Sequence, residues 1–527
     1  MRGLAALLVG ICTIASCSRP IRPASSSSIP PAAQAPPIRM AAAATLVRAG
    51  CLDCLIEALH EYEALRSVPA VAVEATAGAA RTATLVAIRE RELGLEDSGA
   101  LAQARLLAAS SPELSAALSL PIEVADTLAG RGAGSQVTSD AQMLASAPAF
   151  RNRIAWTEVL RVRADENELT AYLWVAFNCT YNSPTNDVIE ALSDGMPAWR
   201  DTSLIRFRIA TCTAFRTALL KEMLDSDPRF LEITYYMGLE AMIQGDLDGA
   251  DAQFERAYGW RPRWARVANT RGTVFMTAED FERAAEFYDR ALKVVPDYPE
   301  ALLGKVRALT FAGRYRDALA ATDALLALER WYIGDARYWR AMNEVQLEQN
   351  DAAWDDVERA ARLITNAEVP KLAGIIAVRR QQLAVARAKF EESRQRDESD
   401  CEVPFYLGTV LVEQREWARS AEAFIAAAGC FDRWQEAIEG QIARIRAGAA
   451  AGVLSERQAR QIARREQQLA GQARMRATSW FNTAAACFNL TRYMEARQYA
   501  TQLLDDPQFG DRARDLMSRI PQGTGTP

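Results

Sequence analysis

The chain has 527 residues, of which 50% are hydrophobic and 24% are charged, so we expect most of it to fold. Its 61 basic and 67 acidic side chains give a formal net charge of −6. This near balance argues against a bulk electrostatic attraction for nucleic acid, and we expect no nucleic-acid partner.

The first residues have the pattern of an exported chain. A short positive start is followed by an apolar run over residues 4–14, which is too short for a membrane-spanning helix of about twenty residues. The run ends in the tetrapeptide IASC at Cys17, which resembles the bacterial lipobox. The resemblance implies a signal peptide over residues 1–16 and acylation of Cys17, which would anchor the protein to a membrane. A plain secretory signal with an incidental cysteine is the alternative.

The residue after the cysteine bears on the destination. Lipoproteins retained at the inner membrane typically carry Asp there, whereas this chain has Ser18, so the resemblance implies the outer membrane, facing the periplasm. Residues 17–40 are rich in Pro, Ser and Ala without an apolar period, and we expect a disordered tether. No later apolar run reaches about eighteen residues, so we expect no transmembrane helix in the mature chain.

Residues 41–229 are rich in helix signals and poor in strand signals. Amphipathic stretches occur around residues 79–93, 97–109 and 153–178. We interpret the region as degenerate helical repeats that continue the array described next. A separate globular helical domain is the alternative.

From about residue 230 one pattern recurs with a displacement of 34 residues: Gly238, Ala250, Phe254, Ala257 and Pro262 are followed by Gly272, Ala284, Tyr288, Ala291 and Pro296. These residues match the tetratricopeptide repeat, with small side chains at repeat positions 8, 20 and 27, an aromatic at 24 and a proline at 32. The small side chains let two helices approach closely, the aromatic fills the gap, and the proline ends the second helix. The resemblance implies an all-α fold, a right-handed superhelical solenoid of antiparallel helix pairs.

Looser copies of the pattern extend this array over residues 230–432. A helical hairpin over residues 433–476, hinged at residues 447–452, is predicted between the sixth and seventh units. Residues 477–520 are predicted to hold the seventh unit and a cap, and residues 521–527 an unstructured tail.

Three arginines of the predicted hairpin, Arg457, Arg460 and Arg464, share one helix face by their three- and four-residue spacing. A solvated face is one interpretation. The other is that this face binds an acidic partner or lipid headgroups.

In tetratricopeptide arrays the first helix of each unit lines a groove, with repeat positions 2, 5, 9 and 12 facing it. Here these positions give a mixed surface of Tyr, Met and Leu with scattered charges, which suits a peptide segment or a partner helix. The alternative is that the N-terminal helices cover these side chains. The predicted groove residues are Tyr235, Leu239, Met242, Asn269, Met276, Leu303, Arg307, Tyr338 and Met342.

The sequence offers little catalytic chemistry. His60 is the single histidine, which excludes any site built from several histidines. The glycines of residues 130–134 resemble a phosphate loop but lack the Lys-Ser or Lys-Thr that such loops need. Carboxylates such as those of residues 351–358 fall at positions expected to face solvent. We therefore predict no enzyme, no metal and no cofactor.

The nine cysteines include two pairs of interest. Cys401 and Cys430 lie at the start of the first helix and the end of the second helix of the sixth unit. These ends are neighbours in an antiparallel hairpin, so a disulfide is geometrically permitted. Cys51 and Cys54 have the C-x-x-C spacing but no preceding strand, so we interpret them as a structural bridge or two buried thiols. The cysteines interpreted as packing residues are Cys179, Cys212 and Cys487.

The sequence thus predicts a lipid-anchored periplasmic scaffold that binds protein partners in envelope, secretion or pilus assembly. The alternative is a glycan- or peptidoglycan-associated binding or processing protein with its site in the N-terminal helical region. A pocket in which tryptophan faces and carboxylates converge would favour this alternative. An open groove rich in aromatic residues would favour the scaffold.

Overall fold

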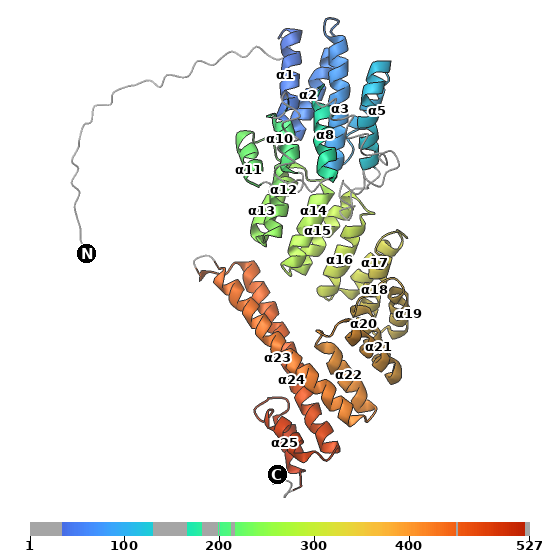
Figure 1. Ribbon diagram of the computed structural model, residues 1–527, viewed down its shortest axis with the longest axis vertical. Helices are drawn as coiled ribbons and strands as arrows, with labels where there is room; N and C mark the ends of the chain where they lie inside the picture. Colours follow the sequence, from blue (N-terminus) through green and yellow to red (C-terminus); the bar gives the residue numbers. More distant parts are fainter. Residues whose placement is uncertain are drawn as a thin grey trace, which may run out of the picture.

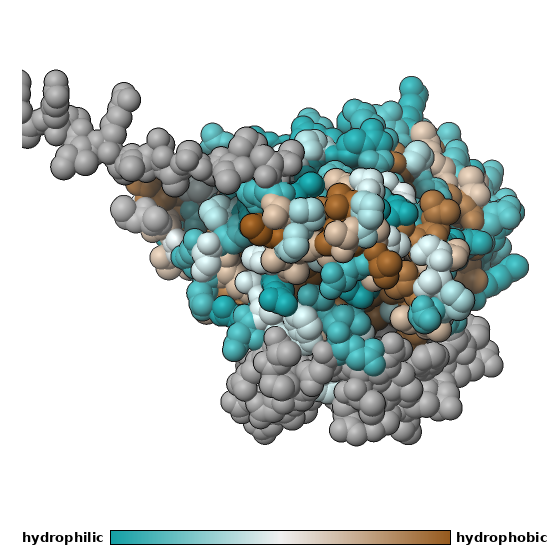
Figure 2. Space-filling model, turned by 90° about the horizontal axis from the view of Figure 1, so that it is seen from above, coloured by the Kyte–Doolittle hydropathy of each residue, from teal (hydrophilic) through white to brown (hydrophobic). Residues whose placement is uncertain are grey.

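The computed structural model describes residues 34–129, 166–181, 199, 201–211, 217–449 and 452–521. Over these residues every regular element is an α-helix, and no strand occurs. The helices form an elongated column that runs from α1 to α25 (Figure 1). None of the described helices is long and apolar enough to cross a bilayer. Viewed over the end that carries the N-terminal helices, hydrophilic and hydrophobic residues are interspersed on the surface (Figure 2).

Eight described helices precede the repeat array: α1 (Pro36–Ala49), α2 (Leu52–Leu65), α3 (Ala72–Leu93), α4 (Ala100–Ala108), α5 (Pro112–Ala129), α8 (Glu168–Tyr181), α10 (Ser203–Ala210) and α11 (Thr217–Ser226). From α1 to α4, each helix packs against the next.

Six helix pairs follow, which we number as units one to six: α12 (Ile233–Ile243) with α13 (Leu247–Trp260), α14 (Ala265–Thr277) with α15 (Phe281–Val294), α16 (Pro299–Phe311) with α17 (Tyr315–Leu326), α18 (Ile333–Gln346) with α19 (Asn350–Ala361), α20 (Glu368–Arg379) with α21 (Leu383–Arg396), and α22 (Glu402–Glu413) with α23 (Trp417–Ala447). The chain continues with α24 (Glu456–Asn489), α25 (Tyr493–Thr501) and α26 (Gly510–Ser518).

The turn inside each unit repeats the same backbone conformation. One residue of each turn is left-handed, with φ between 57° and 80°: Gly245, Glu279, Gly313, Glu348, Gln381 and Arg415. Consecutive members lie 33 to 35 residues apart. The turn of unit four comes one residue late, and the following turn returns to register. The periodicity of the sequence is therefore also a periodicity of the backbone.

Glycine at repeat position 8 lets the aromatic ring at position 24 pack directly on the first helix of the unit. A Cβ atom added to Gly238 would lie 2.6 Å from the ring of Phe254, and one added to Gly272 would lie 2.7 Å from the ring of Tyr288. Phe254 and Tyr288 are both buried. The same contact recurs between Gly374 and Phe390 and between Gly408 and Phe424. These helix pairs confirm the predicted all-α solenoid.

The N-terminal helices share a core with the array. One cluster of buried apolar residues extends from α1 to α14. Polar contacts cross the same boundary. Trp264 Nε1 donates to the Leu93 carbonyl oxygen at 2.7 Å, and Arg266 Nη1 donates to the Glu92 carbonyl oxygen at 2.6 Å. The described part of this region therefore shares a core with the first repeat units.

The hairpin of α23 and α24 extends well beyond the repeat units. α23 has 31 residues and α24 has 34, and both run without a break through the predicted boundaries at residues 433 and 476. The hairpin is thus built by lengthening the second helix of unit six and the helix that follows it. Ile438, Ile442 and Ile462 form a small apolar core between its two helices. The free end of the hairpin points toward α13 and α15 (Figure 1).

Candidate functional site

A pocket of about 360 Å³ lies between the first helices of units two and three, α14 and α16, with Tyr288 of α15 and Tyr332 completing its wall. We call it the groove pocket. Four of the nine predicted groove residues line it: Asn269, Met276, Leu303 and Arg307. The structure therefore brings together predicted residues from two different units.

Polar groups and apolar side chains both face the groove pocket. Asn269 is 3% exposed, and its Oδ1 atom has no hydrogen-bond partner within the described chain. The hydroxyls of Thr273 and Tyr288 lie 3.4 Å apart. Arg307 is exposed, and its guanidinium carbon lies 5.8 Å from the ring centroid of Trp339. The pocket can thus offer an amide, hydroxyls and a cation to one ligand.

Tyr332, which lines the groove pocket, has an unusual backbone conformation. Its backbone is left-handed with φ of 53°, a conformation that side chains with a Cβ rarely adopt. Its hydroxyl donates a hydrogen bond to Glu300 Oε1 at 3.4 Å. Burial, followed by the negative charge of Glu300, raises the pKa of Tyr332 to about 12. The phenol therefore stays protonated at neutral pH and remains a hydrogen-bond donor.

The predicted groove residues of unit one lie elsewhere. The prediction for Tyr235 was wrong, because this side chain is 5% exposed and packs against Trp264, with ring centroids 5.1 Å apart. Leu239 and Met242 are half-buried against the core shared with the N-terminal helices. The N-terminal region thus covers the part of the groove that unit one contributes.

The predicted groove residues of unit four are also outside the groove pocket. Tyr338 and Met342 are half-buried and pack against the apolar cluster of units four and five. The rings of Tyr338 and Trp339 meet edge to face, with centroids 5.4 Å apart. Burial raises the pKa of Tyr338 well above its ordinary value.

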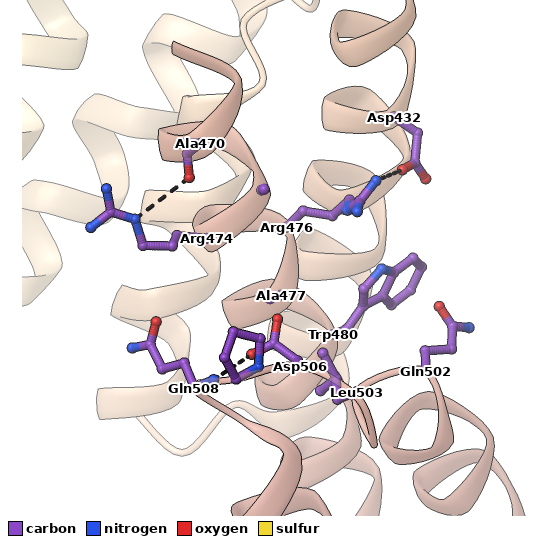
Figure 3. A pocket seen from close by; sticks show the side chains of 12 residues that line it. Asp432, Ala470, Arg474, Arg476, Ala477, Trp480, Gln502, Leu503, Asp506 and Gln508 are labelled. Carbon is purple, nitrogen blue, oxygen red and sulfur yellow. Dashed lines mark hydrogen bonds and ion pairs between the residues drawn. The ribbon is translucent and has the colours of Figure 1, made fainter. Parts of the chain in front are cut away.

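A second pocket, of about 660 Å³, lies between α24 and the segment over residues 502–508. We call it the C-terminal pocket (Figure 3). The indole of Trp480 lines it and stacks on Tyr499 with centroids 5.4 Å apart. Arg476 in the same wall pairs with Asp432 at 2.9 Å. Asp506 accepts hydrogen bonds from the backbone nitrogens of the two residues that begin at Gln508. The sequence did not predict this pocket, because its walls come from three separate segments.

A cluster of buried charges between α18 and α19 was also missed. Asp356 was expected to face solvent, but it is 4% exposed and pairs with Arg337 at 2.5 Å and Arg340 at 3.1 Å. Glu344 lies beside it, 3.3 Å from Arg340. Burial, followed by the charge of Asp356, raises the pKa of Glu344 to about 7. These groups lie between packed helices and line neither the groove pocket nor the C-terminal pocket.

The structure places both predicted cysteine pairs in disulfides. The Cα atoms are 5.3 Å apart for Cys401 and Cys430 and 5.0 Å apart for Cys51 and Cys54. Asp227 lies within 4.8 Å of both sulfurs of the second pair, but a disulfide offers no thiolate to a metal ion. Cys487 is a buried free thiol whose pKa is raised, mainly by burial.

Several predicted features fall where the structure makes no statement. Cys17 and the predicted tether up to residue 33, the glycines of residues 130–134 and Cys212 lie outside the described residues, as does the side chain of Cys179. The prediction of a disordered tether was wrong for residues 36–40, because α1 begins at Pro36. His60 is described, and it is an exposed residue of α2.

The family comparison agrees with the geometry of the repeat units. A family profile described as tetratricopeptide repeat matches residues 275–345, which run from α14 into α18. No curated protein matches the chain.

Several solved structures are similar to parts of the chain. YrrB, described as a TPR protein with an unusual peptide-binding site, is 21% identical over 34% of this chain and 91% of its own, with a TM-score of 0.29. A tetratricopeptide repeat protein from Parabacteroides merdae is 15% identical over 52% of this chain and 93% of its own, with a TM-score of 0.35. PilW, described as a widely conserved type IV pilus biogenesis factor, is 18% identical over 39% of this chain and 92% of its own, with a TM-score of 0.33. The described chain is an all-α solenoid of helix pairs, and the profile match identifies tetratricopeptide repeats over residues 275–345.

Proposed function

We propose that this protein is a lipid-anchored scaffold of the bacterial cell envelope that binds a polypeptide segment of a partner protein. It acts by binding and not as an enzyme. The single observation that supports binding is the groove pocket, in which the buried Asn269 Oδ1 has no partner within the described chain. An extended polypeptide presents N–H donors at regular intervals, and one of these would satisfy this oxygen. Met276 and Leu303 supply adaptable apolar contact.

Photocrosslinking tests the groove pocket directly. A photoreactive amino acid at Thr277, an exposed residue of the pocket wall, should capture a partner in cells. The same amino acid at Glu255, an exposed residue on the second helix of unit one, is the matched control. Adding Arg307→Ala should reduce capture from Thr277 by at least about tenfold, since a hydrogen bond to a charged group contributes about 1.5–3 kcal/mol. Unchanged capture, or equal capture from Glu255, would contradict the proposed binding surface.

The membrane anchor is proposed from residues 1–40. Replacing Cys17 by Ser should move the protein from the membrane fraction to the soluble fraction, because the lipid acceptor is lost. Cys12→Ser removes a cysteine inside the signal peptide and should change nothing. Ser18→Asp should shift the protein from the outer to the inner membrane on a density gradient. If Cys17→Ser fractionates as the parent chain does, the anchor proposal fails.

A saccharide is a second candidate ligand, and the C-terminal pocket favours it. The face of Trp480 offers a platform for the apolar face of a sugar ring. Asp506 and the side-chain amide of Gln502 line the same pocket and can bind hydroxyl groups. The site would then lie at the C-terminal end of the chain and not in the N-terminal region predicted from the sequence.

Fluorescence titration with envelope-derived oligosaccharides tests this candidate. Binding with a Kd below about 1 mM, lost in Trp480→Leu, would support it. Trp331→Leu is the control, because Trp331 is 47% exposed and lies away from the C-terminal pocket. An absence of saturable binding, or equal losses in both variants, would rule the saccharide out.

A further inference from the structure

The hairpin reaches back along the column and contacts the first two repeat units through arginines of α24. Three ion pairs join the two parts: Arg457 with Asp248 at 2.9 Å, Arg460 with Asp280 at 3.2 Å, and Arg465 with Glu279 at 2.6 Å. The arginine face predicted from the sequence therefore meets an acidic partner, and this partner lies within the same chain.

Two aromatic rings add to the contact. The guanidinium carbon of Arg464 lies 4.3 Å from the ring centroid of Phe281, and that of Arg457 lies 5.7 Å from the centroid of Phe275. Such cation–π contacts reinforce an ion pair in a partly desolvated place. We call the whole contact the clasp, which consists of Arg457, Arg460, Arg464, Arg465, Asp248, Phe275, Glu279, Asp280 and Phe281.

The clasp adjoins the groove pocket. Met276 and Thr277 line the pocket at the end of α14. Glu279 and Asp280 follow them directly in the turn of unit two, where they bind α24. The clasp and the groove pocket therefore meet where α14 ends and the turn of unit two begins.

The clasp is a polar contact. No apolar cluster of the described residues contains members of both α24 and units one or two. The isoleucines of the hairpin pack between α23 and α24 instead. Arg457 Nη1 and Arg460 Nε are buried without a hydrogen-bond partner in the described chain, which weakens the closed contact. A contact of this kind opens more easily than an apolar core, and salt weakens it further.

We propose that the clasp fixes the hairpin beside the groove pocket and opens to admit the partner's polypeptide segment. This regulation rests on the function proposed for the groove pocket. α23 is one continuous helix, so the opening motion comes from the array. Each repeat unit contacts mainly its neighbours. Small rotations between units three to five therefore add up to a larger displacement of α24 relative to units one and two. High salt favours the open state, because the Debye length falls to about 3 Å at 1 M.

Pulsed electron–electron distance measurement on the full chain tests the clasp. Spin labels on keto amino acids at Gln244 and Val453, both exposed, leave the cysteines untouched. At low salt, the two labels of the parent chain should lie at one short distance from each other. Combining R457E, R460E and R465E lowers the short-distance population about tenfold, since three attractive pairs become repulsive. R444E changes the charge of an exposed arginine in the same hairpin, outside the clasp, and keeps the short distance.

A charge swap separates an opened clasp from a misfolded chain. R465E alone lengthens the distance, and adding E279R restores the short distance because the pair reforms with reversed signs. Circular dichroism and melting show that each variant remains folded. A short distance that persists in the triple variant at 1 M salt overturns the proposal.

Methionine oxidation measures access to the groove pocket without a partner. Hydrogen peroxide oxidises accessible methionines, and mass spectrometry follows each site. In the triple variant the oxidation rate of Met276 rises several-fold, while Met494, which is 60% exposed, stays unchanged. A longer spin-label distance with no change at Met276 overturns the gating. Because neither measurement uses a partner, failed crosslinking at Thr277 would count against the proposed function and not against the clasp.

Discussion

Arg89 of α3 and Glu232, which precedes α12, form an ion pair at 2.8 Å with both side chains fully buried. The two residues are 143 positions apart in the sequence. Glu232 Oε1 also accepts a hydrogen bond from the backbone nitrogen of Leu52 at 2.8 Å, so the carboxylate joins α2, α3 and unit one. This ion pair fixes the N-terminal helices to the start of the array.

Removal of this buried cation should strongly destabilise the chain. Arg89→Met leaves the Glu232 carboxylate buried without its partner, and we expect the free energy of unfolding to fall by about 3–5 kcal/mol. Urea denaturation measures the change. Arg206→Met is the control, because Arg206 pairs with the exposed Glu222 and its loss should change the free energy by less than about 1 kcal/mol. Equal effects of the two variants would contradict the role of the buried pair.

Two glycine-to-alanine substitutions should have opposite signs. Gly272→Ala places a Cβ atom 2.7 Å from the Tyr288 ring, and the resulting overpacking should lower the free energy of unfolding by about 1–3 kcal/mol. Gly259 lies in α13 with no atom within 4 Å of an added Cβ. Gly259→Ala should therefore raise the free energy of unfolding by up to about 1 kcal/mol. Thermal melting of the two variants checks the pair, and a stabilised Gly272→Ala would show that the ring contact does not restrict this position.

Loss of the disulfide in unit six should lower the melting temperature. Cys401 and Cys430 are 29 residues apart, and a crosslink over a loop of this length contributes about 3–4 kcal/mol when it constrains the unfolded chain. The melting temperature of the double variant Cys401→Ala with Cys430→Ala should depend much less on reductant than that of the parent chain, because only the other disulfides remain to be reduced. Cys51 and Cys54 are only three residues apart, so their crosslink should contribute less. A double variant of Cys401 and Cys430 that melts like the oxidised parent chain would contradict this prediction.

Stability should depend on pH through Glu344. Its pKa is about 7 in the folded chain and 4.5 as an ordinary glutamate, so the folded state binds the proton more tightly. The resulting stabilisation is complete below about pH 4.5 and is lost as the pH rises through about 7. Between pH 5 and pH 8, the free energy of unfolding of Glu344→Gln should therefore fall by about 1–3 kcal/mol less than that of the parent chain. Glu358→Gln, at an exposed residue of α19, should follow the parent chain; identical profiles for all three would rule out a raised pKa.

The sequence was sufficient to predict features that lie within one repeat unit. The contact of Gly272 with Tyr288 follows from their spacing, because both residues belong to the same helix pair. The predicted array over residues 230–432 coincides with the six helix pairs that begin at Ile233. Such contacts depend on local periodicity, which a single sequence displays.

Features that join distant segments were not predictable in the same way. Tyr235 was expected in the groove, but helices far earlier in the chain bury it. The arginine face of α24 was recognised from its spacing, whereas its acidic partners in units one and two were not. The walls of the C-terminal pocket meet only after three segments fold together. In each case the missing information was long-range packing, which residue spacing does not encode.

Because α23 is long, a small tilt at one end of the hairpin produces a large displacement at the other end. At 1.5 Å per residue, a helix of 31 residues is a rod of about 46 Å. A tilt of about 5° at one end displaces the other end by roughly 4 Å, which is enough to separate charges held at ion-pair distance. α23 is the second helix of unit six, so slight repacking of this unit produces a larger displacement of the hairpin's free end beside units one and two. Substitutions there should alter partner capture at a pocket that they never touch.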